Sequence, residues 1–139
     1  MAAVLPKKIQ LEIVSPQRML LSEEVDSVTL PGSEGYLGIL PGHLPLLTTL
    51  KPGVITYEVG GKKKTLAVHD GFLEVLPERV IVMADKVLKP EEINLQEARA
   101  AKERAEKQLA SKEAIDVDKA MAELLHAVAQ IQVAESAQR

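Results

Sequence analysis

The chain lacks cysteine and tryptophan and contains very few aromatic residues. Only 2% of its 139 residues are aromatic. Without cysteine it can form no disulfide, thiol nucleophile or thiolate metal site, which fits a reducing compartment. With so few aromatic side chains, any core must be built mainly from Val, Ile, Leu and Ala.

Long apolar runs and an excess of positive charge are also missing. No run approaches the roughly 20 apolar residues that a membrane-spanning helix needs, and the N-terminal segment has no secretory signal pattern. We therefore expect a soluble cytosolic protein. A net charge of -3 gives no electrostatic reason to expect nucleic-acid binding. His43, His69 and His126 lie in different segments without ligand spacing, so no metal site is expected.

Glycine and proline are absent after Pro90, and this change divides the chain in two. Before Asp85, glycine and proline punctuate short β-branched runs, which favours strands joined by turns. Beyond Pro90 the residues are mostly Ala, Glu, Lys, Leu and Gln, which favour helix. We predict an antiparallel β-sandwich over residues 1–86 and an α-helical hairpin over residues 87–139.

Two strand signals in the first part are clear. Residues 8–14 alternate apolar and polar side chains, as a half-buried strand does. Residues 54–59 and 64–68 flank Gly60-Gly61, which predicts a two-residue β-hairpin turn. Lys62 and Lys63 either lengthen this loop or belong to the strand. We interpret the lysine run at 62–64 as solvated rather than as an anion or lipid-headgroup site.

Residues 30–47 hold four of the eight glycines and three of the eight prolines, with aliphatic residues between them. Glycine allows backbone angles that other residues avoid, and proline fixes φ. This segment is therefore predicted to form tight turns around a very short strand. It carries no catalytic set, and we interpret it as a rigid docking surface.

The second part predicts two helices in an antiparallel hairpin. Asn94, with Glu97 three residues later, is a candidate helix cap, and Asp116 is another. The second helix is expected to have an apolar seam with an alanine row beside it; the seam comprises Val117, Met121, Leu124, Leu125, Val128 and Ile131, and the row comprises Ala120, Ala127 and Ala134. Alanine buries little surface, so this hairpin is either a mobile switch or a static cap.

Taken together, several segments resemble the epsilon subunit family of bacterial F-type ATP synthases, called delta in mitochondria. The most specific is GSEGYLGILPGHLPLL at residues 32–47. It is followed by KPG at 51–53, GFLEV at 71–75 and VMAD at 82–85, and then by AKERAE at 101–106. The resemblance covers nearly the whole chain.

This resemblance implies a ten-stranded sandwich with a two-helix hairpin, in a non-catalytic subunit of the central stalk, or rotor. The implied partners are the gamma subunit, the c-subunit ring and, through the hairpin, the alpha/beta catalytic head. In similar proteins one loop and one turn face the c ring, and the matching residues are Ser33, Glu34, Tyr36 and His43. Membrane association would arise only through the complex, peripherally, at the cytoplasmic face of the bacterial cell membrane.

Some family members bind ATP in the folded hairpin through an Ile-Asp-x-x-Arg start to the first helix and a later arginine. Here Asn94 stands at the aspartate position and Glu97 at the first arginine position, so only Arg104 matches. A carboxylate in place of that cation repels phosphate. We expect feeble or absent ATP binding and no cofactor.

In similar proteins the hairpin can also extend and inhibit ATP hydrolysis through basic residues of its second helix. Here the only lysine of that helix is Lys119, and the other candidate inhibitory contacts, Arg99, Lys102 and Lys107, lie on the first helix. We expect inhibition that is weak, or that depends on the first helix and on apolar contacts.

The residues alone leave one other function open. The chain could be a freestanding β-sandwich module that binds a small ligand or a peptide and dimerises through its hairpin. An enzyme is disfavoured because no nucleophile or acid–base set is found.

Overall fold

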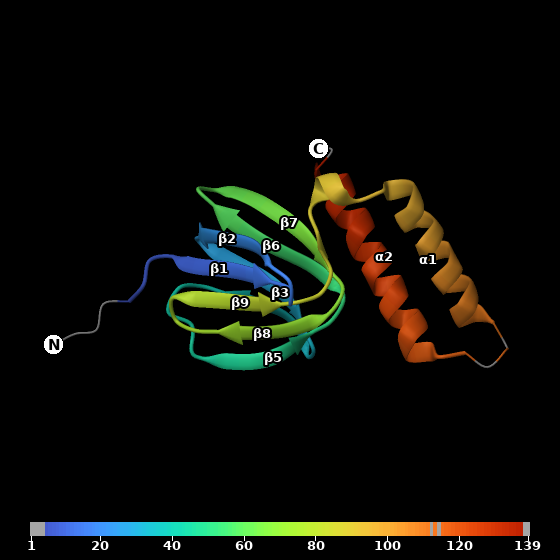
Figure 1. The fold of residues 1–139 in the computed structure, drawn as a ribbon, viewed down its shortest axis with the longest axis horizontal. Coiled ribbons are helices and arrows are strands. Elements are labelled where there is room, and N and C mark those ends of the chain that lie inside the picture. Colours follow the sequence, from blue (N-terminus) through green and yellow to red (C-terminus); the bar gives the residue numbers. More distant parts are fainter. Residues whose placement is uncertain (1–4, 112, 114, 138–139) are drawn as a thin grey trace.

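The protein is a β-sandwich followed by two antiparallel helices (Figure 1). The computed structural model describes residues 5–111, 113 and 115–137. Its strands are β1 Ile9–Val14, β2 Met19–Val25, β3 Ser27–Gly32, β4 Gly35–Ile39, β5 Leu46–Leu50, β6 Gly53–Val59, β7 Lys62–Val68, β8 Gly71–Val75, β9 Arg79–Met83 and β10 Val87–Leu88. A 3-10 helix, η1 Pro90–Glu92, precedes α1 Leu95–Ala110 and α2 Val117–Ala137.

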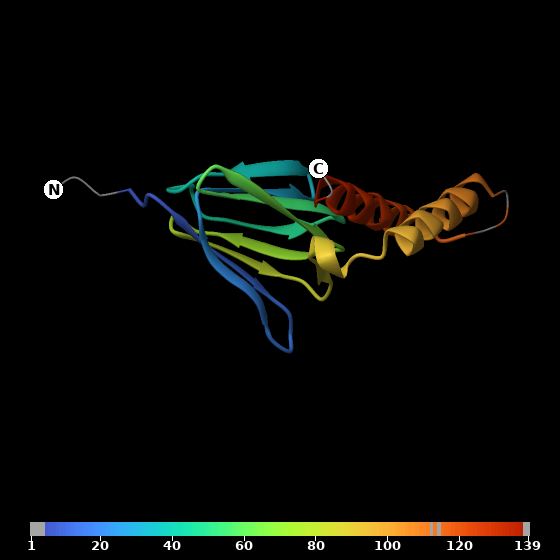
Figure 2. The same cartoon turned by 90° about the horizontal axis from the view of Figure 1, so that it is seen from above.

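The strands form two layers that share one hydrophobic core. One layer has the order β10-β7-β6-β3-β4 and the other β5-β8-β9-β1-β2, and they join where Gly32 of β3 pairs with Leu50 of β5. The predicted β-sandwich is confirmed, with one pair that departs from the antiparallel expectation, since β1 and β9 run parallel. Figure 2 shows the layers from above.

The alternation predicted for the first strand is observed. Ile9, Leu11 and Ile13 are fully buried, and the residues between them are partly exposed. Each such side chain contributes roughly 1.5–3 kcal/mol of transfer free energy on burial. The strand therefore anchors one layer of the core.

The β6–β7 hairpin resolves the position of the lysines. Val59 pairs with Lys62, so the turn is the two residues Gly60 and Gly61, both with positive φ. This is the geometry of a tight hairpin turn that glycine makes possible. Lys62, Lys63 and Lys64 belong to β7 and are exposed, as expected for a solvated strand end.

Both predicted helix caps are present. The Asn94 side chain accepts a hydrogen bond from the Glu97 backbone N–H at 3.1 Å, and Asp116 accepts one from the Lys119 backbone N–H at 3.1 Å. Positions 112 and 114 of the predicted break between the helices lie outside the described residues. These caps satisfy amide groups that the first helical turn leaves free.

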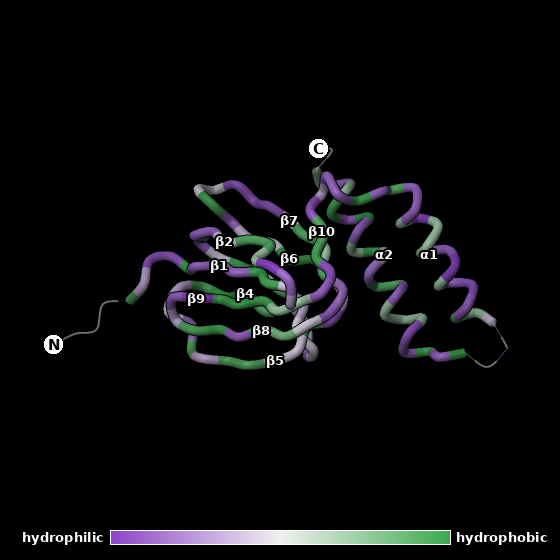
Figure 3. The backbone as a smooth tube through the Cα atoms, in the orientation of Figure 1, coloured by the Kyte–Doolittle hydropathy of each residue, from purple (hydrophilic) through white to green (hydrophobic). Residues whose placement is uncertain are grey.

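The predicted apolar seam of α2 is confirmed only in part, because Leu124, Val128 and Ile131 are partly buried and the other three residues are not. Val117, Met121 and Leu125 are exposed, whereas the alanine row Ala120, Ala127 and Ala134 is buried together with Ala129, Val133 and His126. The reason is that α2 lies between α1 and the sandwich, in contact with both. Small side chains let it approach both neighbours closely. Figure 3 shows that α1 is largely hydrophilic along its length.

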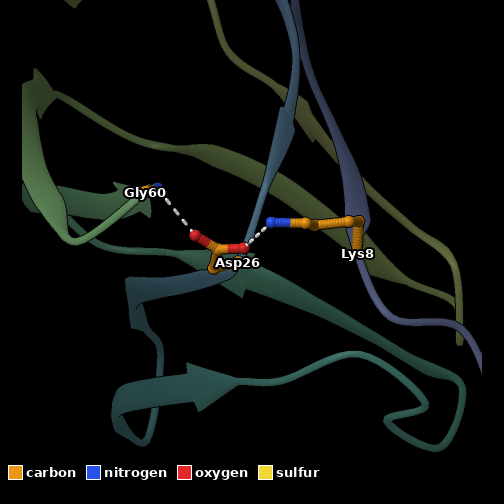
Figure 4. A network of polar contacts seen from close by, with 3 residues as sticks. All are labelled: Lys8, Asp26 and Gly60. Atoms are coloured by element: carbon orange, nitrogen blue, oxygen red, sulfur yellow. Dashed lines mark hydrogen bonds and ion pairs between the residues drawn. The ribbon is translucent and has the colours of Figure 1, made fainter.

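A polar network ties the N-terminal strand to the β6–β7 turn. Asp26, between β2 and β3, accepts a hydrogen bond from the Gly60 backbone N–H at 2.8 Å and forms an ion pair with Lys8 (Figure 4). The hydrogen bond from Lys8, followed by that from Gly60, lowers the pKa of Asp26 below its ordinary value. The network therefore stabilises the folded state only while Asp26 is ionised.

We predict that Asp26→Ala lowers the free energy of unfolding at neutral pH. Because the folded-state pKa of Asp26 is depressed, its contribution is present above about pH 4 and is lost as pH falls through the folded-state pKa. The free energies of unfolding of the wild type and the variant, measured with urea between pH 7 and pH 3, should differ most at pH 7. This difference should become smaller as the pH falls. Glu78→Gln, at an exposed loop position, is the control. A difference that is constant with pH would contradict the prediction.

Candidate functional site

The β3–β4 turn and the start of β4 carry three of the four residues expected to face the c ring. Ser33 is held to β5, because its backbone N–H donates to the Thr49 carbonyl at 3.0 Å and its hydroxyl lies 3.3 Å from that of Thr48. Tyr36 accepts a hydrogen bond from the Val54 backbone N–H at 3.0 Å and is 58% exposed. Glu34 is exposed between them. The turn is thus a fixed, solvent-facing surface.

Glycine is required next to this turn. A Cβ atom at Gly53 would lie 2.7 Å from the Tyr36 hydroxyl and 2.7 Å from the Pro31 Cβ. These approaches are shorter than van der Waals contact. Gly53 therefore allows the start of β6 to pass close to Pro31 and Tyr36, which holds the turn in place.

His43 lies away from these three residues. It belongs to the β4–β5 connection, so the five residues of β4 separate it from the β3–β4 turn, a span of roughly 15 Å. Its Nδ1 lies 2.7 Å from the Leu44 carbonyl, and the neighbouring Gly42 backbone N–H donates to the Pro77 carbonyl at 2.7 Å. The four residues expected to face the ring therefore do not form one continuous surface.

An apolar patch lies on the outer face of the β5-β8-β9-β1-β2 layer. Cross-strand pairing places Phe72 beside Met83, Met83 beside Val14, and Val14 beside Met19. Leu47 of β5 is 70% exposed and Phe72 is 58% exposed. We call Met19, Leu47, Phe72 and Met83 the outer-sheet patch. The sequence does not reveal this patch, because alternation along a strand does not show which exposed apolar residues become neighbours.

A groove of about 610 Å³ opens at the end of this patch. Phe72, Met83, Val14 and Pro16 supply apolar lining. The carboxylates of Asp70 and Asp85, both exposed residues, lie at the groove. This arrangement suits a partner surface that combines apolar side chains with positive charge.

The basic residues expected to make inhibitory contacts lie on the hairpin, and two of them form ion pairs there. Arg99 of α1 pairs with Glu135 of α2 at 3.4 Å, and Lys107 pairs with Glu103 one turn away at 3.2 Å. Lys119 is exposed, and Lys102 is partly exposed. Exposed pairs of this kind are worth little, so these side chains can exchange partners at small cost.

The residues compared with a nucleotide site line a cavity of about 320 Å³ between the hairpin and the sandwich. Its charged lining residues are Lys86 and Arg104, with the carboxylates Glu92, Glu97 and Glu123. Asn94 lines the same cavity, but its side-chain oxygen caps α1. Three carboxylates against two cations give a poor environment for a triphosphate.

The structure brings together two histidines that are distant in sequence. The rings of His69, after β7, and His126, on α2, have centroids 4.7 Å apart. His126 is 4% exposed, and neither of its ring nitrogens has a hydrogen-bond partner within the described part of the chain. Burial, followed by nearby His69 and Lys86, lowers the pKa of His126 to about 4. No group of three metal-ligating side chains occurs among the described residues.

Comparisons with known proteins agree with the fold and the motifs. The family model described as ATP synthase, Delta/Epsilon chain, beta-sandwich domain, matches residues 8–90, and the model of its long alpha-helix domain matches residues 91–135. The ATP synthase epsilon chain of Solibacter usitatus is 44% identical over 133 residues, 94% of this chain and 98% of that protein. The epsilon chain of Desulfitobacterium hafniense is 45% identical over 126 residues, which cover 91% of this chain and 96% of that protein.

Solved structures show the same architecture. A chain in the Euglena gracilis mitochondrial ATP synthase (OSCP/F1/c-ring) aligns with a TM-score of 0.77 at 26% identity, covering 99% of this chain and 85% of that one. A chain of the Tetrahymena thermophila mitochondrial central stalk and c ring aligns with a TM-score of 0.56 at 14% identity. The alignment covers 95% of this chain and 97% of that one, and it supports the fold alone. With both family domains matched in order along residues 8–135, this chain belongs to the ATP synthase delta/epsilon chain family.

Proposed function

We propose that this chain is a non-catalytic subunit of the central stalk of an F-type ATP synthase, where it helps couple proton flow to ATP synthesis. The observation that carries this proposal is the match to both domains of the delta/epsilon family together with epsilon chains at about 44% identity. The similarity to a chain of the Euglena assembly supports a place in such a complex. Within the described residues, no helix is long and apolar enough to span a bilayer. We propose peripheral association with the cytoplasmic face of the bacterial cell membrane, through the complex.

We assign gamma binding to the outer-sheet patch and its groove, and c-ring contact to Ser33, Glu34 and Tyr36. The patch consists of exposed apolar side chains on one face of the sheet, and the exposed carboxylates at its groove favour a partner with basic side chains. His43 precedes Leu47 of the patch by four residues and lies away from the β3–β4 turn. We therefore place His43 with the gamma-binding surface.

The hairpin is proposed to be the regulatory element, able to leave the sandwich and approach the alpha/beta head. Val117, Met121 and Leu125 are exposed along one side of α2 while the hairpin is docked. These apolar residues, with Arg99, Lys102 and Lys107 of α1 and Lys119 of α2, are available for contacts in an extended state. The docked contact with the sandwich uses other residues, chiefly Ala129 and Val133.

We predict that Phe72→Glu weakens binding to the gamma subunit by about tenfold or more, because a charge would be buried in an apolar interface. The measurement is co-elution with gamma in size-exclusion chromatography, followed by titration. Lys63→Glu on the opposite layer is the matched control and should bind as the wild type does. A wild-type chain that forms a homodimer and ignores gamma would favour the freestanding binding module instead.

Removing the hairpin should raise ATP hydrolysis by the catalytic assembly, modestly because α2 offers few basic residues. The truncation belongs after Lys89, since Val87 and Leu88 pair with β7 and complete the sheet. Hydrolysis is compared for assemblies that contain the full or the shortened chain in equal amounts. Equal rates would remove an inhibitory role for the hairpin.

The full chain is predicted not to bind ATP at micromolar concentration, because carboxylates outnumber cations in the cavity beside Arg104. Isothermal titration calorimetry with Mg-ATP is the direct measurement. The double variant Asn94→Asp and Glu97→Arg is the matched comparison, and it should bind more tightly than the wild type. Micromolar binding by the wild-type chain would contradict the prediction.

A further inference from the structure

His126 occupies an unusual position at the contact between hairpin and sandwich. It lies on α2, beside Ala127 and Ala129 of the buried face, and is itself 4% exposed. Its ring packs against that of His69, and neither ring nitrogen is hydrogen-bonded within the described part of the chain. A charged imidazolium in this place would lose its water, and only the Val68 backbone and Asp70 would favour its charge, which is too little to offset burial. The docked hairpin therefore requires a neutral ring.

The charges around His126 come from every neighbouring element. Positive potential comes from His69 and from Lys86, which follows β9, while Asp70 and the backbone of Val68 act in the opposite direction. The adjoining cavity is also lined by Glu92 of η1, by Glu97 and Arg104 of α1, and by Glu123 of α2 itself. Burial is the largest effect, and the pKa of His126 in the docked state is about 4.

We propose that the contact around His126 is an acid-sensitive latch, in which protonation of this ring releases the hairpin from the sandwich. The neutral ring fits the buried position between α2 and the end of β7. The protonated ring is better solvated once α2 has moved away. The helices can remain helical in the released state, because both carry side-chain caps and α1 is rich in strong helix formers.

The direction and size of the effect follow from linkage. A released His126 has a pKa of about 6.5, whereas the docked one is about 4. Docking is therefore strongest at a pH above the pKa of the released ring, and it weakens as pH falls toward the pKa of the docked ring. The docking equilibrium constant should fall by about tenfold between pH 7.5 and pH 5.5, and by roughly 300-fold in total below pH 4.

Thiol labelling can measure this release, because the chain has no cysteine of its own. Ala129→Cys places one thiol in the buried contact between α2 and β7, and Ser136→Cys places one at an exposed position of the same helix. Each full-length variant is labelled with dithiodipyridine, which reacts with thiols at acidic pH. The ratio of the two rates removes the pH dependence of the thiol itself and reports the released fraction.

The ratio is expected to rise about tenfold from pH 7.5 to pH 5.5 and to become independent of pH in this range when His126→Gln is added. His69→Gln and the exposed-loop variant His43→Gln should both keep the rise. A ratio that does not change with pH, or a rise that survives His126→Gln, would overturn the proposal. If the labelling ratio no longer rises at low pH in the His69→Gln variant, the titrating group is His69, and this result would also overturn the proposal.

A measurement without substitutions complements the labelling. In the unmodified chain, the ring protons of His126 should titrate below pH 5 by NMR, and titration near pH 6.5 would overturn the latch. Both experiments use the isolated protein, so they stand or fall separately from the rotor assignment. The consequence for the enzyme, that acid makes the hairpin available to the catalytic head, rests on the proposed function.

Discussion

The contact between α2 and the sandwich is made by small side chains, and this sets how firmly the hairpin is held. Ala129 and Val133 of α2 meet Ala67 of β7, with Val54, Leu88 and Ile93 around them. At roughly 25 cal/mol per Å² of buried apolar surface, alanine contributes little. The small side chains let α2 approach the sandwich closely, but they bury little apolar surface. A change of one charge at His126 therefore acts on a contact that buries little apolar surface.

The two layers of the sandwich separate two tasks. The layer containing β6 and β7 receives the hairpin, and the layer containing β5, β8 and β9 presents the outer-sheet patch. Between them lies a core of fully buried aliphatic residues such as Ile9, Leu11 and Leu73. Such cores are closely packed and rigid, and the two surfaces approach each other near Asp70, which lies at the groove and also acts on His126.

Sequence patterns between neighbouring residues predicted strands, turns and helix caps well. They predicted poorly which distant segments pack together. The alternation at residues 9–14, the turn at Gly60-Gly61 and the caps at Asn94 and Asp116 each depend on neighbours in sequence, and each is present. The rotation of α2 could not be predicted, because its alanine row and its larger apolar residues both have helical spacing. The separation of His43 from Ser33 and the meeting of His69 with His126 depend on how distant segments pack.

The exposed apolar residues of the sandwich and of α2 also affect how the chain behaves before it is assembled. Leu47 and Phe72 on the sandwich, and Val117 and Met121 on α2, are exposed within the part of the chain that the structure describes. Exposed clusters of this kind promote self-association and capture by chaperones. Until these surfaces are covered, they leave the chain open to self-association.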